Sequence, residues 1–254
     1  MLHRRFLFAC ALALASLVAV PAAQAWTWNW GSGERVKGSG DIVSETRDVG
    51  RFDGVSLAGS FKVLVRQGES DKIELKADNN LLALIETKVV ESRKGRTLEI
   101  STKRGYNLNS SQTPQILVSV AALRSVAVAG SGDVHIDAMK TNDVEASVAG
   151  SGDISFVELT ADKVGLSVAG SGAVVAAGRT GALSVSVSGS GDIKARSLVA
   201  EEVKVSIAGS GDVGVNAVKK LNVSVAGSGD VRYEGSPEVK TSIAGSGSVR
   251  KFKD

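Results

Sequence analysis

The stretch that decides the fold runs from Val203 to Val215 and reads VKVSIAGSGDVGV. Its odd-numbered residues are valine, isoleucine or glycine throughout, and its even-numbered residues are polar or small. Such alternation, rich in β-branched residues, is typical of a strand with one buried face and one exposed face. Related stretches repeat the pattern between residues 125 and 250, where no 3.6-residue periodicity survives, so helix is excluded there.

The Gly-Ser-Gly in this stretch is one of seven regular copies spaced 18 to 20 residues apart. They begin at Gly130, Gly150, Gly170, Gly189, Gly209, Gly227 and Gly245. Earlier copies occur at Gly31 and Gly38, and a degenerate copy is Gly59-Ser60-Phe61. Propeller blades have a longer period, and sandwiches do not repeat one turn sequence so faithfully. The repeat therefore predicts an all-β parallel β-helix, a solenoid with about 20 residues in each coil.

The role of the two glycines has two interpretations. Glycine adopts positive φ without steric cost, which suits a corner, and it lacks a side chain, which suits close approach of two chain segments. A phosphate-binding loop is disfavoured, because no helix and no Lys-Ser/Thr pair follows. The sequence leaves corner and close approach open.

The part from 38 to 120 is less regular than the repeats from 121 to 254. One short helix is predicted near 78–86, with Asp78 or Asn79 as its cap. The polar loop from Lys103 to Gln115 is the first candidate for a functional loop, with a mobile excursion as the alternative.

The first 25 residues have the features of a secretory signal peptide. Arg4 and Arg5 precede an apolar run, and Ala23-Gln24-Ala25 predicts cleavage between Ala25 and Trp26. A lipoprotein signal at Cys10 is the less favoured alternative. We therefore expect export to the periplasm, the extracellular space or the cell surface, with a spacer over 26–37, one domain over 38–254 and no transmembrane segment after cleavage.

Composition excludes several classes of protein. The chain has 254 residues, with 29 Gly, 3 Pro and one Cys, so collagen, disulfide scaffolds and cysteine-rich zinc sites are excluded. Removal of Arg4 and Arg5 lowers the formal net charge from +3 to +1. A nearly neutral chain lacks the basic footprint expected for nucleic-acid binding. No cofactor is predicted.

Two polar columns follow from stacking the coils in register. Aspartate follows the motif at Asp133, Asp153, Asp192, Asp212 and Asp230. These carboxylates are weak candidates for Ca²⁺, and aspartate bonding to turn amides is the favoured alternative.

Serine recurs three residues before the motif at Ser147, Ser167, Ser186, Ser206, Ser224 and Ser242, beside a column of alanine. This face is a candidate surface for a protein or glycan of the cell envelope or for self-association, and a solvated sheet is the alternative.

Catalysis has little support in the sequence. His135 lies between Asp133 and Asp137 on the outward parity of one strand, and no serine nucleophile accompanies it. We predict a non-enzymatic binding, adhesion or scaffolding module. The alternative is a polysaccharide-active β-helical lyase or hydrolase, which requires a cleft between the 103–115 loop and nearby coils.

The motifs also resemble a bacterial family. Arg51-Phe52-Asp53-Gly54-Val55, Val63 to Gly68, Asp78 to Leu82 and the recurring Ala-Gly-Ser-Gly-Asp are similar to the head GIN domain family, labelled "putative auto-transporter adhesin". The resemblance runs from about Gly38 to the C-terminus. It implies an exported, right-handed β-helical domain and supplies no catalytic residues. The repeat continues to Gly247, where an auto-transporter would have a membrane barrel, so only the adhesin part of the label is carried forward as a hypothesis.

Overall fold

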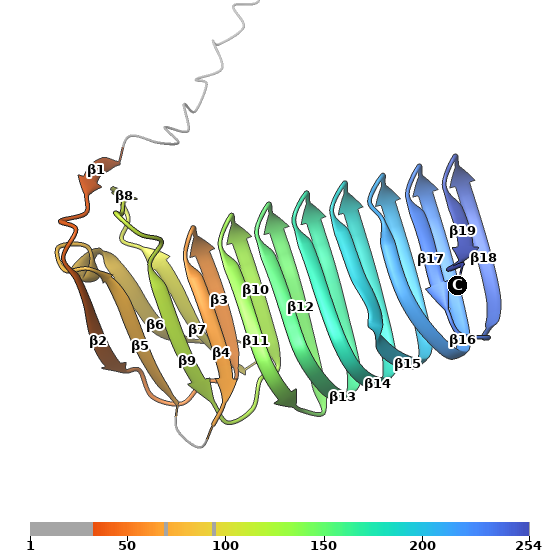
Figure 1. Ribbon diagram of the computed structural model, residues 1–254, viewed down its shortest axis with the longest axis horizontal. Coiled ribbons are helices and arrows are strands. Elements are labelled where there is room, and N and C mark those ends of the chain that lie inside the picture. The colour runs from red at the N-terminus through yellow and green to blue at the C-terminus, as the bar shows by residue number, and fades with distance from the viewer. Residues whose placement is uncertain (1–32, 69–70, 93–94, 254) are drawn as a thin grey trace, which may run out of the picture. The chain divides into compact units, whose positions relative to one another are not determined.

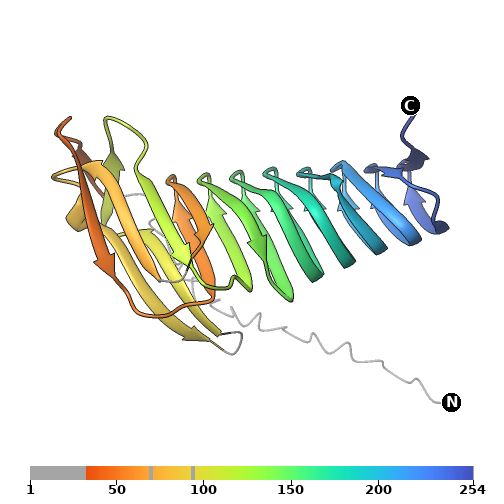
Figure 2. The ribbon, with the colours of Figure 1, turned by 60° about the horizontal axis from the view of Figure 1, so that its bottom comes forward.

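The computed structural model describes residues 33–68, 71–92 and 95–253. These residues form a β-solenoid whose coils stack in one row, as the repeat predicts (Figures 1 and 2). Equivalent strands of successive coils pair in parallel. The strands of the regular coils are β10 (Ser125–Gly130), β11 (Asp133–Lys140), β12 (Asp143–Gly150), β13 (Asp153–Gly170), β14 (Ala173–Gly189), β15 (Asp192–Gly209), β16 (Val213–Gly227), β17 (Asp230–Glu234), β18 (Glu238–Gly245) and β19 (Ser248–Lys251).

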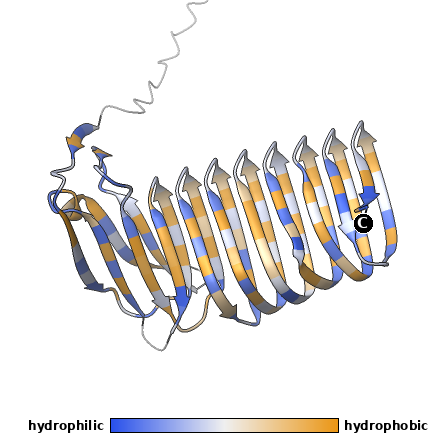
Figure 3. Cartoon of the chain, in the orientation of Figure 1, coloured by the Kyte–Doolittle hydropathy of each residue, from blue (hydrophilic) through white to orange (hydrophobic). Residues whose placement is uncertain are grey.

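Each coil contributes to two sheets. The serine sheet contains β10, β12, β18 and the second halves of β13 to β16, and the aspartate sheet contains β11, β17, β19 and the first halves of β13 to β16. Apolar and polar residues alternate along these strands (Figure 3). One face of each sheet is therefore buried inside the solenoid, and the other lies on its surface.

The interior is filled by columns of β-branched side chains. One column on the serine sheet consists of residues that are each at most 2% exposed: Val128, Val148, Val168, Val187, Ile207 and Val225. Burial of such a side chain contributes roughly 1.5–3 kcal/mol relative to exposure. The stack therefore stabilises each coil through its neighbours, because a single coil has no partner for its apolar face.

The Gly-Ser-Gly motif is both a corner and a close approach. Gly150 has φ of +131°, and a Cβ there would lie 2.6 Å from the carbonyl oxygen of Gly130 in the preceding coil. A Cβ on Gly152, which is buried, would collide with the carbonyl oxygen of Gly132 and lie 2.7 Å from Cγ1 of Val128. The first glycine supplies the conformation and both supply the space, so the two interpretations of the motif hold together.

The order of the coils in space differs from their order in the sequence. The strands β3 (Gly54–Gly59) and β4 (Lys62–Gln67) form a coil that pairs with β10 and β11. On its other side this coil pairs with β7 (Gly95–Thr102) and β9 (Gln115–Val120). The strands β7 and β9 thus lie beside β3 and β4 on the side away from β10 and β11, although they come later in the sequence than β3 and β4.

The degenerate copy at Gly59 is a true member of the stack, because a Cβ on Gly130 would lie 3.3 Å from the carbonyl oxygen of Gly59. The copy at Gly38 lies outside the stack, in the loop that wraps around the buried Asp78, and the copy at Gly31 lies outside the described residues.

Antiparallel strands close the N-terminal end. The strand β2 (Ile42–Asp48) pairs with β5 (Lys72–Asp78), β5 pairs with β9, and β6 (Ile85–Ser92) pairs with β7. The expected helix near 78–86 is a single 3₁₀ turn, Leu82–Leu84, without a side-chain cap. It ends at Ile85, which is already extended, because the alternation from Ile85 favours strand pairing with β7.

Two short strands lie beside this end of the solenoid. The strand β1 (Glu34–Lys37), within the stretch expected to be a spacer, pairs with β8 (Tyr106–Asn109). Among the described residues, no helix has the length and apolar character needed to cross a membrane.

Candidate functional site

The six serines of the predicted column lie side by side on the outer face of the serine sheet. The strand register pairs them in sequence, from Ser147 with Ser167 through to Ser224 with Ser242. Five are exposed, and Ser167 is half-buried. The alanine column, in which Ser188 takes one place, runs beside them in the same register, so the face consists of hydroxyl and methyl groups at the spacing of the strands, about 4.8 Å.

A groove of about 640 Å³ lies over the N-terminal half of this face. Small side chains form its floor, among them Ser125, Ser147 and Ser186. Glu99 and Val90, from the N-terminal strands β7 and β6, lie along it. The groove exists because these longer side chains stand beside residues that extend little beyond the sheet.

The predicted aspartates also form a column, on the aspartate sheet, and the carboxylates of Asp153, Asp192 and Asp230 accept hydrogen bonds from backbone amides. The Oδ1 atom of Asp153 accepts a hydrogen bond of 2.8 Å from the amide of Ala173 in the next coil. Asp192 accepts one from Asp212, at 3.3 Å. Each of these bonds joins residues 20 apart in the sequence, so it links one coil to the next and is not the local turn bond that the sequence favours. Within the described ranges, no group of three His, Cys, Asp or Glu residues is arranged to hold a metal ion.

The carboxylate of Asp230 also bonds to the next coil, with two hydrogen bonds instead of one. Its Oδ1 atom accepts hydrogen bonds from the amide and the hydroxyl of Ser248, at 2.9 and 2.7 Å. The hydroxyl bond is the main cause that lowers the pKa of the Asp230 carboxyl, and the charges of Arg250 and Arg232 add to it.

The remaining predicted residues are not brought into one site. His135 points outward with its Nε2 atom 3.7 Å from Asp137, whose carboxylate also accepts a 2.8 Å bond from Arg66. The 103–115 loop pairs with β1 through β8 and bonds to Asp78 through Ser111. The cleavage residues Ala25 and Trp26 lie outside the described residues.

A second hollow, of about 670 Å³, lies on the outside of the aspartate sheet and was missed by the sequence reasoning. Its floor contains Leu64 and Leu117, which are cross-strand neighbours on outward positions. Its charged lining residues are of both signs and include Lys62, Lys76, Glu74, Asp133 and Asp153. The sequence does carry a signal, because the triplets Val63–Val65 and Ile116–Val118 are apolar throughout, where alternation would place a polar residue at the centre.

The chain is similar to known proteins in both sequence and fold. The family model "Putative auto-transporter adhesin, head GIN domain" matches residues 51–237. The chain belongs to this family. No curated protein matches it.

Solved structures similar to this chain include proteins from Bacteroides fragilis and Parabacteroides distasonis. A protein titled a putative adhesin from Bacteroides fragilis is 24% identical, with a TM-score of 0.80 over 85% of this chain and 100% of that one. A protein titled a putative lipid binding protein from Parabacteroides distasonis is 27% identical, with a TM-score of 0.70. The match covers 87% of the head GIN domain protein described here and 100% of the Parabacteroides chain. These similar proteins are named as adhesins or binding proteins and not as enzymes.

Proposed function

We propose that this head GIN domain protein is exported and acts as a non-enzymatic binding module of the cell envelope, with the serine face as its docking surface. The observation that carries the proposal is the unbroken register of six outward serines beside an alanine column and next to a groove. Hydroxyl groups both donate and accept hydrogen bonds, so a flat face of them suits an extended, hydroxyl-rich ligand such as an envelope polysaccharide. The adhesin names of the family and its solved structures agree with a binding role.

The experiment that tests this proposal is binding to glycan arrays and to isolated envelope polysaccharide. The double variant Ser186→Arg/Ser206→Arg places two long cations on the face and is expected to abolish binding. The matched control is Ser190→Arg/Ser210→Arg, which changes exposed corner serines of the same coils. Equal binding by both variants would exclude the serine face.

The same assay separates binding from catalysis. The polysaccharide-active alternative requires a cleft beside the 103–115 loop, and in the structure this loop packs against β1 and Asp78. Product release from a bound polysaccharide would favour the enzyme, and binding without turnover favours the module.

Export has its own test. Expression of the full chain in a bacterium, followed by cell fractionation and mass spectrometry of the N-terminus, is expected to find a chain beginning at Trp26 outside the cytoplasm. A chain that retains Met1 in the cytoplasm would contradict it.

The hollow on the aspartate sheet supports a second candidate function, the binding of an amphiphile. Leu64 and Leu117 offer an apolar floor, and charged groups of both signs surround it, the lysines Lys62 and Lys76 and the carboxylates Glu74, Asp133 and Asp153. The similar protein titled a putative lipid binding protein agrees with this candidate. Calorimetric titration with a fatty acid tests it, with loss of the binding heat expected in Leu64→Asp. An unchanged binding heat is expected in the control Val218→Asp, whose side chain is exposed on the distant strand β16.

A further inference from the structure

The coil formed by β18 and β19 has an open edge. The strand β18 pairs with β16 and β19 pairs with β17, and no other strand of the described residues pairs with their opposite edges. Phe252, just after β19, lies over the aspartate sheet and not along this edge, because its amide bonds to Tyr233 and its ring stacks on Arg196, 4.4 Å from the guanidinium carbon. An edge of this kind presents unpaired backbone donors and acceptors to another strand.

The apolar interior also opens at this coil. Ile243 continues the column that ends in the buried Val225, yet it is 42% exposed. Val239 and Val249 are likewise inward positions of this coil and are partly buried against the core. The end of the solenoid therefore carries an apolar patch between two strand edges.

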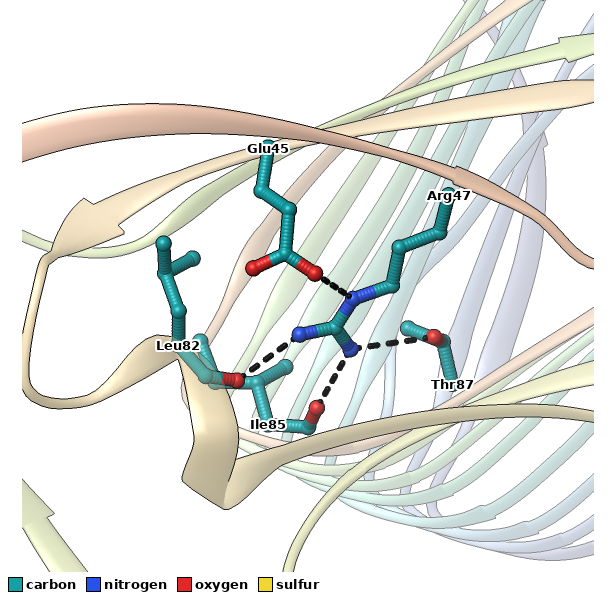
Figure 4. Close-up of polar contacts among 5 residues, drawn as sticks. All are labelled: Glu45, Arg47, Leu82, Ile85 and Thr87. Carbon is teal, nitrogen blue, oxygen red and sulfur yellow. Dashed lines mark hydrogen bonds and ion pairs between the residues drawn. The ribbon is translucent and has the colours of Figure 1, made fainter.

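The opposite end of the solenoid is closed by charge. Glu45 and Arg47 occupy inward positions of β2, where they pair with the buried Leu75 and Ile73 of β5. Arg47 bonds to Glu45 at 2.7 Å and donates to the carbonyl oxygens of Leu82 and Ile85, at 2.8 and 2.6 Å (Figure 4). Inward-pointing charges are a recognised means of preventing a sheet from pairing further.

We propose that the β18–β19 coil pairs with the same coil of a second copy, which makes a closed two-fold dimer joined end to end. Such a contact is isologous and ends growth at two copies, whereas a head-to-tail contact would require the blocked β2 end and would continue into a filament. The dimer extends the role of this protein beyond the proposed binding function and does not depend on it.

The sequence of the coil is self-complementary in one antiparallel register. Ile243 and Val249 each lie two residues from the Gly245–Gly247 corner, so one two-fold axis passes close to both. When the two-fold axis is placed there, Ile243 faces Ile243 of the partner subunit, and Val249 faces Val249 of the partner subunit. The inward polar residues Thr241 and Lys251 then lie opposite glycines of the partner's corner, where no side chain crowds them. Apolar β-branched pairs at the centre of the seam stabilise antiparallel pairing.

Sedimentation of the purified protein tests the proposal. The expected mass is that of two chains, falling to half in Ile243→Lys, which places two cations at the centre of the seam. The control Val157→Lys changes a comparably exposed valine far from the end and is expected to stay dimeric. Circular dichroism and the melting temperature show that each variant is folded.

A second variant tests the register directly. Ile243→Cys in a Cys10→Ser background leaves one cysteine, which is expected to form a disulfide between copies under mild oxidation. The proposal is overturned if the protein is a monomer at every concentration, if its mass grows without limit, if Ile243→Lys stays dimeric, or if the cysteine variant fails to cross-link.

Discussion

Ser111 holds the carboxylate of Asp78 with both its amide and its hydroxyl, at 3.0 and 2.7 Å. The amide of Gly40 adds a third hydrogen bond, at 2.7 Å, to the same buried carboxylate. Three segments distant in the sequence thus meet at one side chain, which ties the loop before β2 and the loop after β8 to the end of β5. This is why Asp78 does not cap a helix.

We predict that Asp78 makes stability depend on acid pH. The hydroxyl bond from Ser111, followed by the amide bonds, lowers the pKa of Asp78 against the opposing effect of burial. A carboxyl whose pKa is lower in the folded state stabilises the fold above its unfolded pKa, about 3.9, and loses that contribution as pH falls through the folded value. Urea unfolding at pH 7 and pH 3 is expected to show the loss. Asp78→Asn should be less stable at pH 7 and should show a smaller pH dependence, whereas a variant that retains the full pH dependence would contradict the prediction.

The second glycine of a corner should tolerate no side chain. A Cβ on Gly211 would collide with the carbonyl oxygen of Gly191 and lie 2.8 Å from Cγ1 of Val187. Because the backbone of the stacked coil cannot move away, Gly211→Ala is expected to destabilise by about 1–3 kcal/mol, as overpacked cores do. Ser210→Ala in the same corner is the control and should change the free energy of unfolding by less than about 0.5 kcal/mol. Calorimetry measures both.

The cost of shortening a side chain should depend on its place in the column. Ile207 is 2% exposed and Ile243 is 42% exposed, in equivalent positions. Ile207→Val is expected to cost about 0.5–1.5 kcal/mol, in the range for a buried methyl group. Ile243→Val should cost less when unfolding is measured at a protein concentration that leaves the chain monomeric. Equal costs would mean that the open end is covered within one chain.

Loss of the Ser248 hydroxyl should raise the pKa of Asp230. That hydroxyl is the largest cause of the lowered pKa, so Ser248→Ala is expected to move it upward, toward the ordinary aspartate value. Carbon-detected NMR titration of the carboxyl reports the change. Ser246→Ala, in the adjacent corner, serves as the control and should leave the titration of Asp230 unaltered.

Calcium should leave the melting temperature unchanged. Asp153, Asp192 and Asp230 bind amides of the next coil, and a ligand stabilises a protein only when it binds the folded state. A rise in melting temperature with added Ca²⁺, absent in Asp192→Asn, would show instead that the column binds the ion.

The repeated part of the fold was predictable because one local rule applies to every coil. The period of two and the glycine spacing determine the strands and both outer columns from 121 onward, whereas they leave open whether the glycines form a corner. The insertion of β7 and β9 beneath β3 was not predictable, since parallel pairing of Val55 with Leu98 leaves no trace in local alternation. The 3₁₀ turn also escaped prediction, because Asp78 resembles a helix cap in sequence and its bonding to Ser111 depends on a distant loop.

The candidate surfaces also differ in whether the sequence predicts them. The serine and aspartate columns follow from register alone, whereas the hollow beside Leu64 requires β4 and β9 to be neighbours. The seam at Ile243 requires knowledge that its coil has an open edge. Sequence periodicity thus locates what every coil shares and misses what only a terminus of the stack possesses.

The inserted coil gives the assembly of the chain a direction. The coil of β3 and β4 rests on β7 and β9, so it cannot be completed until the chain has been made as far as Val120. After β10 and β11 have paired with β3 and β4, each new coil pairs with the one just formed, through contacts close in sequence, which favours rapid growth. The slow pairing of β3 and β4 with β7 and β9, which are distant in the sequence, therefore comes first. It forms the edge to which the later coils are added.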